Sequence, residues 1–385
     1  MSDPFGTIST EAILEGRATD AYFERTRSTL EHAGRNPQVV AEVTADQFST
    51  GAFEVFTGVE SVARLFEGRA VDIDALPDGQ LFDGGPVMRI EGPYLEFAEL
   101  ETSLLGLLSQ PSGFATAALE ARLGAPDSLV LSFGARHVHP SIASVVERAA
   151  LLAGLDGFSH VAAGETLSRE ASGTMPHALM FCFGEGNQAD AWTAFDEAVP
   201  ESTPRIALVD TFWDEKSESL LAAETLGDDL DGVRIDTTGS RRGDFRHIIR
   251  EVRWELDARG HEDVDIFCSG GLGPEQLHTL RELADGFGVG SHITNRDPVD
   301  FSLDIVEIEG ELISKRGKLS GVKDVYRTPD GSHHIGLSDR DGPDGGESLL
   351  EPLLRDGEVV RTFDLEAARE RCLADAEAVG FTSSA

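Results

Sequence analysis

A strand-then-helix rhythm between residues 129 and 294 constrains the fold more than any other feature of this sequence. Six short β-rich runs each end in polar or glycine residues and lead into a helical pattern; they span 129–136, 157–165, 205–212, 232–239, 264–271 and 287–294. Strands that alternate with helices predict parallel βαβ units. Six such units favour a complete or slightly short TIM-like barrel, with functional residues at the carboxyl ends of the strands. An open doubly wound sheet is the alternative that this pattern leaves open.

The flanking segments follow other patterns. Residues 90–123 predict two helices separated by a Gln-Pro-Ser-Gly break. After residue 300 the rhythm stops, and 304–327 reads as strands of a different layer. A loop rich in Gly and Asp follows at 333–349, and 364–380 predicts a terminal helix that faces solvent.

The charge composition limits the partners of the chain. The formal net charge is −37, and only four of the 32 basic residues are lysines. Acidic residues spread along the whole chain are typical of proteins adapted to multimolar salt, where charge repulsion is screened; an acidic partner surface is the alternative. The acid surplus excludes a globally basic nucleic-acid face but leaves room for a local anion site built by arginines.

Other classes of protein are disfavoured by what the sequence lacks. The three cysteines, Cys182, Cys268 and Cys372, are widely spaced and odd in number, which argues against a disulfide framework or a CxxC metal site. No run approaches the roughly 18 apolar residues that would span a bilayer. The N-terminus lacks a basic start followed by an apolar run. We therefore expect a cytoplasmic globular protein with no membrane partner.

Two glycine-containing turns follow consecutive late strands. Ser269, Gly270 and Gly271 follow one buried strand and precede a helix, and the next strand ends in glycines and a serine, namely Gly288, Gly290 and Ser291. Glycines let backbone N–H groups approach an anion, and a helix N-terminus adds partial positive charge. As adjacent barrel loops they predict a phosphate-monoester site. Taken singly, each is equally consistent with a tight turn that needs glycine for its backbone conformation.

Carboxylates follow two neighbouring strands. Asp210 ends one strand, and Asp236 and Thr237 end the next. Such residues can orient ribose hydroxyls or hold Mg²⁺ through water, although Asp and Thr after a strand also commonly cap the following helix. Arg234 shares a strand face with Asp236. An Arg–Asp pair in a barrel interior is costly unless a site uses it, so we interpret the pair as functional.

Three further segments carry side chains that could act in a site. Arg136, His137 and His139 leave one strand together, and without a third ligand a metal site there is not indicated. His177 lies in an otherwise apolar stretch, which by itself indicates a core histidine. Tyr22 follows a predicted helix start, where it either packs or forms a stacking wall for a flat aromatic ligand.

These motifs, taken in order, resemble the type II phosphoribosyltransferases and, within them, the nicotinate phosphoribosyltransferases. The resemblance covers most of residues 15–327 and rests on TDAYFERT, EGPYLEFAELETSLLG, SFGARHVHP, SGTMPHALM, ALVDTF, GVRIDTTG, SGGL and FGVGSHIT. It implies an N-terminal α/β sandwich domain (1–108), an irregular α/β barrel with phosphate loops (109–302) and a C-terminal segment (303–385) whose strands complete the N-terminal domain. It also implies a homodimer or higher homo-oligomer.

The implied reaction joins nicotinate to 5-phosphoribosyl 1-pyrophosphate, which gives nicotinate mononucleotide and pyrophosphate in NAD biosynthesis. The implied cofactors are Mg²⁺ and, in many family members, ATP as a co-substrate. No residue is assigned to a metal with certainty. Quinolinate phosphoribosyltransferase is the alternative within the fold, and a non-catalytic phosphate-binding barrel is the alternative from another class.

The resemblance also assigns roles to individual residues. Tyr22 corresponds to the aromatic that stacks on nicotinate, and Arg136 to the arginine at the pyrophosphate or the nicotinate carboxylate. Asp236, Thr237 and Arg234 correspond to the ribose site. The two glycine turns correspond to the 5-phosphate cradle, and His177 to the histidine that ATP phosphorylates.

Two departures from the family pattern stand out. His137 replaces the second arginine of an FGxRR motif, which puts pyrophosphate binding there in doubt. Some archaeal relatives carry a C-terminal zinc knuckle of four cysteines, whereas only Cys372 remains in that region, so we predict no zinc.

Overall fold

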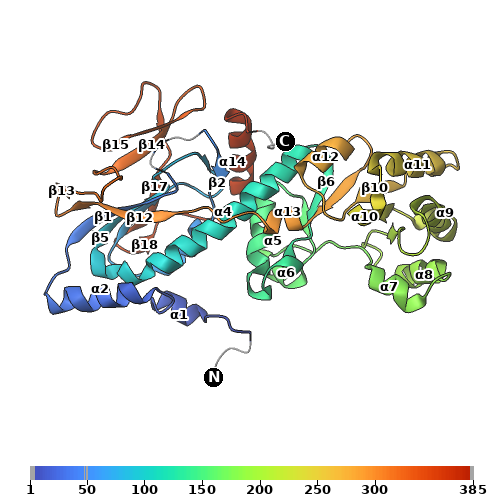
Figure 1. Cartoon of the computed structure of the whole chain (residues 1–385), viewed down its shortest axis with the longest axis horizontal. Coiled ribbons are helices and arrows are strands. Elements are labelled where there is room, and N and C mark those ends of the chain that lie inside the picture. Colours follow the sequence, from blue (N-terminus) through green and yellow to red (C-terminus); the bar gives the residue numbers. More distant parts are fainter. Residues whose placement is uncertain (1–4, 47, 49–50, 382–385) are drawn as a thin grey trace. The chain divides into compact units, whose positions relative to one another are not determined.

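The computed structural model describes residues 5–46, 48 and 51–381, which fall into two units (Figure 1). The first unit comprises the chain up to Thr116 together with Leu152–Gly154 and Arg296–Phe381. The second comprises Ala117–Leu151 and Leu155–Asn295.

Strands from both ends of the chain share one sheet in the first unit. The sheet has the order β13-β12-β1-β5-β3-β17-β18, and every neighbouring pair is antiparallel. Its strands are β1 (Gln38–Thr44), β3 (Asp72–Ala75), β5 (Met88–Pro93), β12 (Ser302–Ile308), β13 (Glu311–Leu312), β17 (Glu351–Arg355) and β18 (Glu358–Val359). Figure 1 shows β12, in orange, beside β1, in blue. The segment after residue 300 thus supplies strands, as predicted.

Smaller sheets and five helices complete the first unit. The sheets pair β14 (Lys323–Arg327) with β15 (His333–Leu337) and β16 (Glu347–Ser348), and β2 (Glu54–Val55) with β4 (Leu81–Phe82). The helices are α1 (Thr10–Leu14), α2 (Ala21–His32), α3 (Val59–Phe66), the first part of α4 (Glu101–Gly124) and α14 (Leu365–Ala378). Apolar residues of α3 and α4, such as Phe66 and Leu104, pack with strand residues such as Ile73 and Ile90 in one buried core.

Helix α4 runs without interruption through the predicted break, so the expectation of two helices is wrong. Pro111 lies inside the helix. Proline has no N–H to donate to the carbonyl four residues earlier, that of Leu107. A Cβ on Gly58 would meet this same carbonyl oxygen at 2.2 Å, which means that a backbone without a side chain packs closely against it. Tertiary packing around the proline thus accommodates the local helix-breaking signal.

Helix α14 is not simply solvent-facing, which corrects a second expectation. It buries Ala368, Cys372 and Asp375. The Asp375 carboxylate accepts a hydrogen bond from the Leu81 N–H at 2.8 Å. One face of this helix therefore packs into the first unit.

The second unit contains the predicted parallel sheet. All six predicted strands are present, as β6 (Leu129–Ser132), β7 (Gly157–Phe158), β8 (Ile206–Leu208), β9 (Gly232–Ile235), β10 (Asp265–Cys268) and β11 (Gly286–Val289). Their order is β7-β6-β11-β10-β9-β8, and every pair is parallel. The mixed α/β class is confirmed. Since β7 and β8 are the outer strands and do not pair with each other in the described part of the chain, closure into a barrel stays a prediction.

Helices of the second unit alternate with these strands. They are α5 (Ala143–Leu152), α6 (Val161–Leu167), α7 (His177–Phe183), α8 (Gln188–Ala198), α9 (Glu215–Leu226), α10 (Gly239–Arg242), α11 (Phe245–Asp257), α12 (Pro274–Leu280) and α13 (Ser291–Thr294). Buried residues at helical spacing, such as Ile249, Val252 and Leu256, give α11 its apolar face. Within residues 5–46, 48 and 51–381, no helix is long and apolar enough to cross a membrane.

Candidate active site

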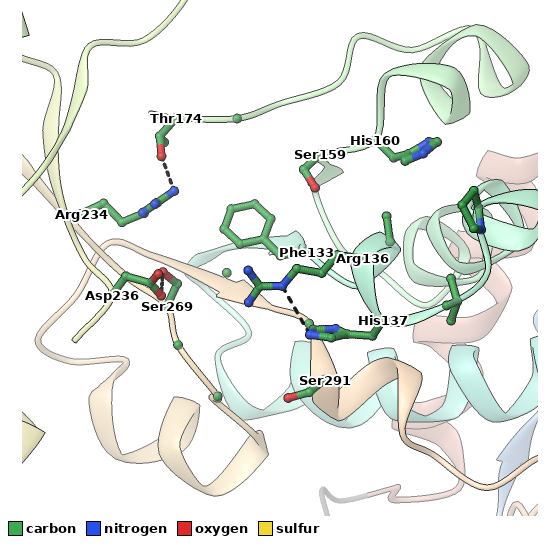
Figure 2. Close-up of a pocket in the computed structure, with 18 residues that line it drawn as sticks. Phe133, Arg136, His137, Ser159, His160, Thr174, Arg234, Asp236, Ser269 and Ser291 are labelled. Carbon is green, nitrogen blue, oxygen red and sulfur yellow. Dashed lines mark hydrogen bonds between the residues drawn. The ribbon is translucent and has the colours of Figure 1, made fainter. Parts of the chain in front are cut away.

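A cavity of about 780 Å³ lies at the carboxyl ends of β6, β9, β10 and β11 (Figure 2). Because parallel strands all end at the same edge of a sheet, residues that follow different strands converge there. Nine of the predicted site residues line this pocket: Arg136, Arg234, Asp236, Ser269, Gly270, Gly271, Gly288, Gly290 and Ser291. Their roles stay predictions, but the structure brings them together.

The turn after β10 presents backbone N–H groups. Gly270 and Gly271 have φ angles of +92° and +70°, which favour glycine. The Ser269 N–H donates to the Ile235 carbonyl at 3.0 Å, and its hydroxyl donates to Asp236 Oδ1 at 2.7 Å. The N–H groups of Gly270 and Gly271 donate no hydrogen bond within the described chain. They are therefore available to an anion.

The helix that follows this turn contributes less than expected. Helix α12 begins at Pro274, and the pocket lining from this segment ends at Gly271. The turn itself, and not the helix N-terminus, faces the cavity.

The end of β11 and the turn after it need glycine for packing. A Cβ on Gly288 would lie 2.2 Å from the Phe133 ring, and one on Gly290 would lie 2.8 Å from the Phe133 carbonyl oxygen. Phe133 itself lines the pocket. These two glycines therefore let the backbone pack closely against Phe133, which follows β6, and they also line the cavity.

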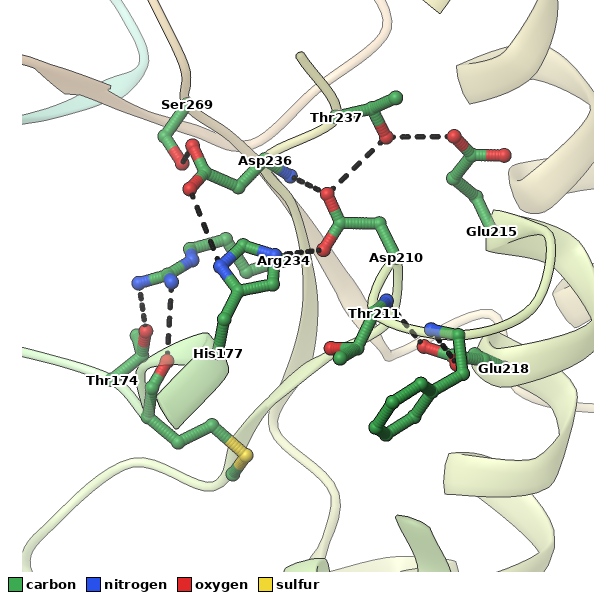
Figure 3. Close-up of polar contacts among 12 residues, drawn as sticks. Thr174, His177, Asp210, Thr211, Glu215, Glu218, Arg234, Asp236, Thr237 and Ser269 are labelled. Atoms are coloured by element: carbon green, nitrogen blue, oxygen red, sulfur yellow. Dashed lines mark hydrogen bonds and ion pairs between the residues drawn. The ribbon is translucent and has the colours of Figure 1, made fainter. Parts of the chain in front are cut away.

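Asp210 organises the side of the pocket formed by β8 and β9 (Figure 3). Its side chain is only 2% exposed. Asp210 Oδ2 accepts hydrogen bonds from the Asp236 N–H at 2.9 Å and from the Thr237 hydroxyl at 3.3 Å. The Thr237 hydroxyl also lies 2.6 Å from a Glu215 carboxylate oxygen. Asp210 therefore supports the backbone of Asp236, Thr237 lies between Asp210 and Glu215, and neither Asp210 nor Thr237 lines the cavity.

His177 lies between two carboxylates and is not a core residue. Its Nε2 is 3.2 Å from Asp210 Oδ1, and its Nδ1 is 3.9 Å from Asp236 Oδ2. The side chain is 34% exposed. The hydrogen bond with Asp210 raises the pKa of His177 above its ordinary value, and burial acts in the opposite direction. The residues next to His177 in the sequence are apolar and gave no sign of these carboxylates. Asp210 and Asp236 follow strands β8 and β9, which lie elsewhere in the chain.

Arg234 already donates hydrogen bonds to two groups of the protein. Its guanidinium donates to the Thr174 hydroxyl and, at 3.1 Å, to the Met175 carbonyl. Burial lowers the pKa of Arg234. Arg234 therefore anchors the segment that leads into α7, while it also lines the pocket.

Arg136 is exposed and extends toward the side of the pocket that holds Asp236 and Ser269 (Figure 2). Its Nε donates to His137 Nε2 at 3.3 Å. His139 instead contacts the Ser141 hydroxyl at 2.8 Å. Among the residues placed by the structure, no three His, Cys, Asp or Glu side chains form a group that could hold a metal ion.

Tyr22 belongs to the first unit, on α2, and is 56% exposed. Its hydroxyl lies 3.3 Å from Asp20 Oδ2. Its predicted stacking role stays a prediction.

Sequence reasoning missed two supporting residues. Glu218 is fully buried, and its carboxylate accepts hydrogen bonds from the N–H groups of Thr211, Phe212 and Trp213 at 2.9–3.0 Å. Arg242 donates to backbone carbonyls of the two loops beside Asp236. Neither residue has a local sequence signal, because each acts on backbone groups that folding brings to it.

Comparisons with known proteins show which family the chain resembles. The N-terminal domain model of quinolinate phosphoribosyl transferase matches residues 20–112, and the C-terminal domain model matches residues 114–304. A structure described as nicotinate-nucleotide pyrophosphorylase from Pyrococcus furiosus is 46% identical with a TM-score of 0.93, over 98% of this chain and 99% of that one. Human nicotinic acid phosphoribosyltransferase is 19% identical with a TM-score of 0.73, over 94% of each chain, and so shows a shared fold.

A sequence relative extends the comparison to bacteria. The nicotinate phosphoribosyltransferase of Bacillus subtilis is 28% identical over 283 residues, which are 68% of this chain. The match spans only 56% of that relative's own length.

Proposed function

The chain belongs to the type II phosphoribosyltransferases, and on that premise we propose that it is a nicotinate phosphoribosyltransferase. It would join nicotinate to 5-phosphoribosyl 1-pyrophosphate. The C1–O bond to pyrophosphate breaks and pyrophosphate leaves with the electron pair. The pyridine nitrogen supplies its lone pair to form the new N–C1 bond, which yields nicotinate mononucleotide.

The chemistry needs positioning and charge stabilisation more than proton transfer. The pyridine nitrogen carries a free lone pair, so no general base has to act. The transition state resembles an oxocarbenium ion beside a departing anion. Catalysis therefore consists of holding both reactants in line and stabilising charge in a preorganised site.

One observation carries the proposal: a single pocket holds backbone N–H groups without a partner in the described chain beside a supported carboxylate. The Gly270 and Gly271 N–H groups suit the 5-phosphate. Asp236, held by Ser269 and Asp210, suits the ribose hydroxyls. Arg136 supplies an exposed guanidinium for the pyrophosphate or the nicotinate carboxylate. A protein that only bound phosphate would need the turn but not the other two.

The small number of arginine and lysine side chains that line the pocket supports nicotinate over quinolinate as the acceptor. The lining arginines are Arg136 and Arg234, and no lysine lines the cavity within the described residues. Arg234 already binds Thr174 and Met175. An acceptor with one carboxylate fits this supply better than one with two. Quinolinate stays the second candidate because the matching domain models carry its name.

We also propose that His177 accepts a phosphoryl group from ATP. Nε2 is engaged by Asp210, whereas Nδ1 faces the pocket carboxylate at 3.9 Å and is the freer nitrogen. In this step an N–P bond forms on Nδ1, the P–O bond to ADP breaks, and ADP leaves. Asp210 would orient the ring and stabilise its positive charge.

Magnesium is expected to accompany the anionic substrates. The described residues gather no group of three ligating side chains, so the ion would be held largely by the oxygens of the substrate.

The proposal is tested by pyrophosphate release with nicotinate, quinolinate or nicotinamide as acceptor, with and without ATP. The assay uses phosphoribosyl pyrophosphate and Mg²⁺ in about 2 M KCl, which screens the acidic surface. Turnover with nicotinate alone is expected. Turnover with quinolinate would overturn the acceptor, and no turnover with any of the three by folded protein would support the non-catalytic alternative. Lack of any ATP effect would overturn the role of His177.

A further inference from the structure

Arg242 binds both loops that flank Asp236, yet it does not line the pocket. Its Nε donates to the Thr237 carbonyl at 2.9 Å. One terminal nitrogen donates to the Ser269 carbonyl at 3.3 Å and also to the Gly270 carbonyl. All three acceptors are backbone oxygens, so the guanidinium joins the loop after β9 to the turn after β10.

The contacts of Arg242 with these carbonyls also fix the direction of the N–H groups in the same peptide planes. The Ser269 carbonyl shares a peptide plane with the Gly270 N–H, and the Gly270 carbonyl shares one with the Gly271 N–H. In a trans peptide the C=O and N–H point to opposite sides. With both carbonyls held toward Arg242, both N–H groups point away from it. These are the N–H groups that donate no hydrogen bond within the described chain, and Ser269, Gly270 and Gly271 line the cavity.

The surroundings hold Arg242 in this arrangement. Its guanidinium carbon lies 4.3 Å from the centroid of the Phe245 ring, which covers one face of the group. A Cβ on Gly270 would lie 3.0 Å from an Arg242 terminal nitrogen and 3.0 Å from Asp236 Oδ1. The turn is therefore closely packed between the arginine and the carboxylate. The positive charge of Arg242 adds to the electrostatic potential behind the turn, while the Arg242 side chain stays outside the anion site.

We propose that Arg242 is a positioning residue that aims the Gly270 and Gly271 N–H groups at a phosphate monoester in the pocket. It acts through the backbone and does not contact the ligand. The identity of the ligand as a sugar phosphate rests on the proposed function, whereas the direction of the N–H groups rests on the contacts of Arg242 alone.

Two arginines of the same unit provide matched controls. Arg241 precedes Arg242 on α10 and is exposed, so Arg241→Ala removes the same charge from the same helix. Arg253 also donates to backbone carbonyls, those of His261 and Val264, both at 2.6 Å, and it pairs with Asp257; neither carbonyl belongs to a residue that lines the pocket. Arg253→Ala therefore reports what the loss of structural arginine contacts away from the pocket does.

The experiment measures binding of ribose 5-phosphate by calorimetry, and the KM for phosphoribosyl pyrophosphate and for nicotinate by steady-state kinetics. Arg242→Ala is expected to weaken ribose 5-phosphate binding at least about tenfold, the loss that corresponds to one charge-assisted hydrogen bond. The KM for phosphoribosyl pyrophosphate should rise by a similar factor, while the KM for nicotinate stays within about twofold. Added guanidinium should restore part of the binding, and Arg241→Ala and Arg253→Ala should bind like the wild type.

Contrary results are equally specific. Wild-type affinity in folded Arg242→Ala would overturn the proposal, as would an equal loss in Arg253→Ala or an absence of ribose 5-phosphate binding by the wild type. If Arg242→Ala does not fold, Arg242→Lys decides, since one ammonium cannot bind all three carbonyls in the same fork geometry and an intermediate loss is expected; unchanged affinity there counts against the proposal. Arg242-dependent binding without turnover of nicotinate would leave this inference standing and overturn the proposed function.

Discussion

Two regions at the pocket differ in the chemical groups that form them. Near the ends of β8 and β9, the titratable side chains of Asp210, Asp236 and His177 form a connected group, of which Asp236 lines the cavity. On the side of β10 and β11, the surface consists mainly of backbone and glycine; Arg242 supports it from behind, and Phe133 packs against it within the cavity lining. The first side changes its charge with pH, whereas backbone N–H groups do not titrate in the physiological range. We therefore expect the reactions at the ribose and at His177 to depend on pH. Binding of the phosphate should depend instead on the backbone conformation of the turn after β10.

The largest expected effect comes from adding one methyl group to the backbone side. Gly270→Ala would place a Cβ 3.0 Å from Asp236 Oδ1 in a residue with a φ of +92°. Strain of about 1–3 kcal/mol together with a displaced turn should lower kcat/KM for phosphoribosyl pyrophosphate about a hundredfold. Gly239→Ala is the control, because its Cβ would meet nothing within 4 Å. A Gly270→Ala enzyme with wild-type kcat/KM would contradict the assignment of this turn.

The next largest effect is expected on the side-chain side, from Asp210→Asn. The amide has one oxygen, so it cannot accept from the Asp236 N–H and also face His177 with a charge. We expect kcat/KM with ATP to fall about tenfold and the free energy of unfolding to fall by about 1–3 kcal/mol. Chemical denaturation and steady-state rates measure both. Asp228→Asn, at an exposed carboxylate, should change neither quantity; equal behaviour of the two variants would refute the role of Asp210.

The pH dependence sharpens the same comparison. Since Asp210 raises the pKa of His177, the neutral imidazole that can accept a phosphoryl group forms only at a pH above its ordinary midpoint. Stabilisation from this raised pKa is complete below the unfolded value and is lost as the pH rises through the folded value. ATP-dependent phosphorylation should therefore increase with pH, and Asp210→Asn should move its midpoint down. A midpoint that the variant leaves in place would argue against this pairing. Binding of ribose 5-phosphate should be less dependent on pH than phosphorylation.

The smallest effect on turnover is expected at a carboxylate of the same unit that does not line the pocket. Glu147, on α5, is fully buried. Burial raises the pKa of Glu147 to about 7, while the Ser132 hydroxyl is a hydrogen-bonding group that acts on its carboxylate and lowers its pKa. Because the folded pKa exceeds the ordinary value, stability contributed by the protonated form is lost as pH rises toward and through about 7.

Glu147→Gln should therefore leave kcat/KM unchanged and make the thermal midpoint less dependent on pH between about 5 and 8. Thermal unfolding at several pH values measures this. A variant whose midpoint falls with pH as steeply as that of the wild type would contradict the assignment.

Several site positions could be predicted because they are local features of the chain. Asp236 and Gly270 both directly follow buried strands, and the six parallel strands were recognisable from their alternation with helices. The ends of such strands share one edge, so these residues were expected to meet. Arg136 was found in the same way, since it follows β6.

Other features had no local signal. The role of Glu218 depends on a turn that folds back over its own helix, and that of Arg242 depends on two loops that come from different strands. Proline 111 signalled a helix break that packing against Gly58 removed. The apolar neighbours of His177 indicated a core residue, and only the family resemblance assigned it a role; the structure then placed the carboxylates of Asp210 and Asp236 beside it.

By itself the sequence determined which segments are strands, which residues stand at their carboxyl ends and which family the motifs resemble, because side-chain periodicity and turn chemistry are properties of consecutive residues. Only the tertiary structure decided which of those ends are neighbours. The order β11-β10-β9-β8 brings Gly270, Asp236 and Asp210 side by side, and it settles which donors face the cavity and which, like Arg242, act from behind. Such contacts join residues that are distant in the chain, and no pattern of consecutive residues encodes them.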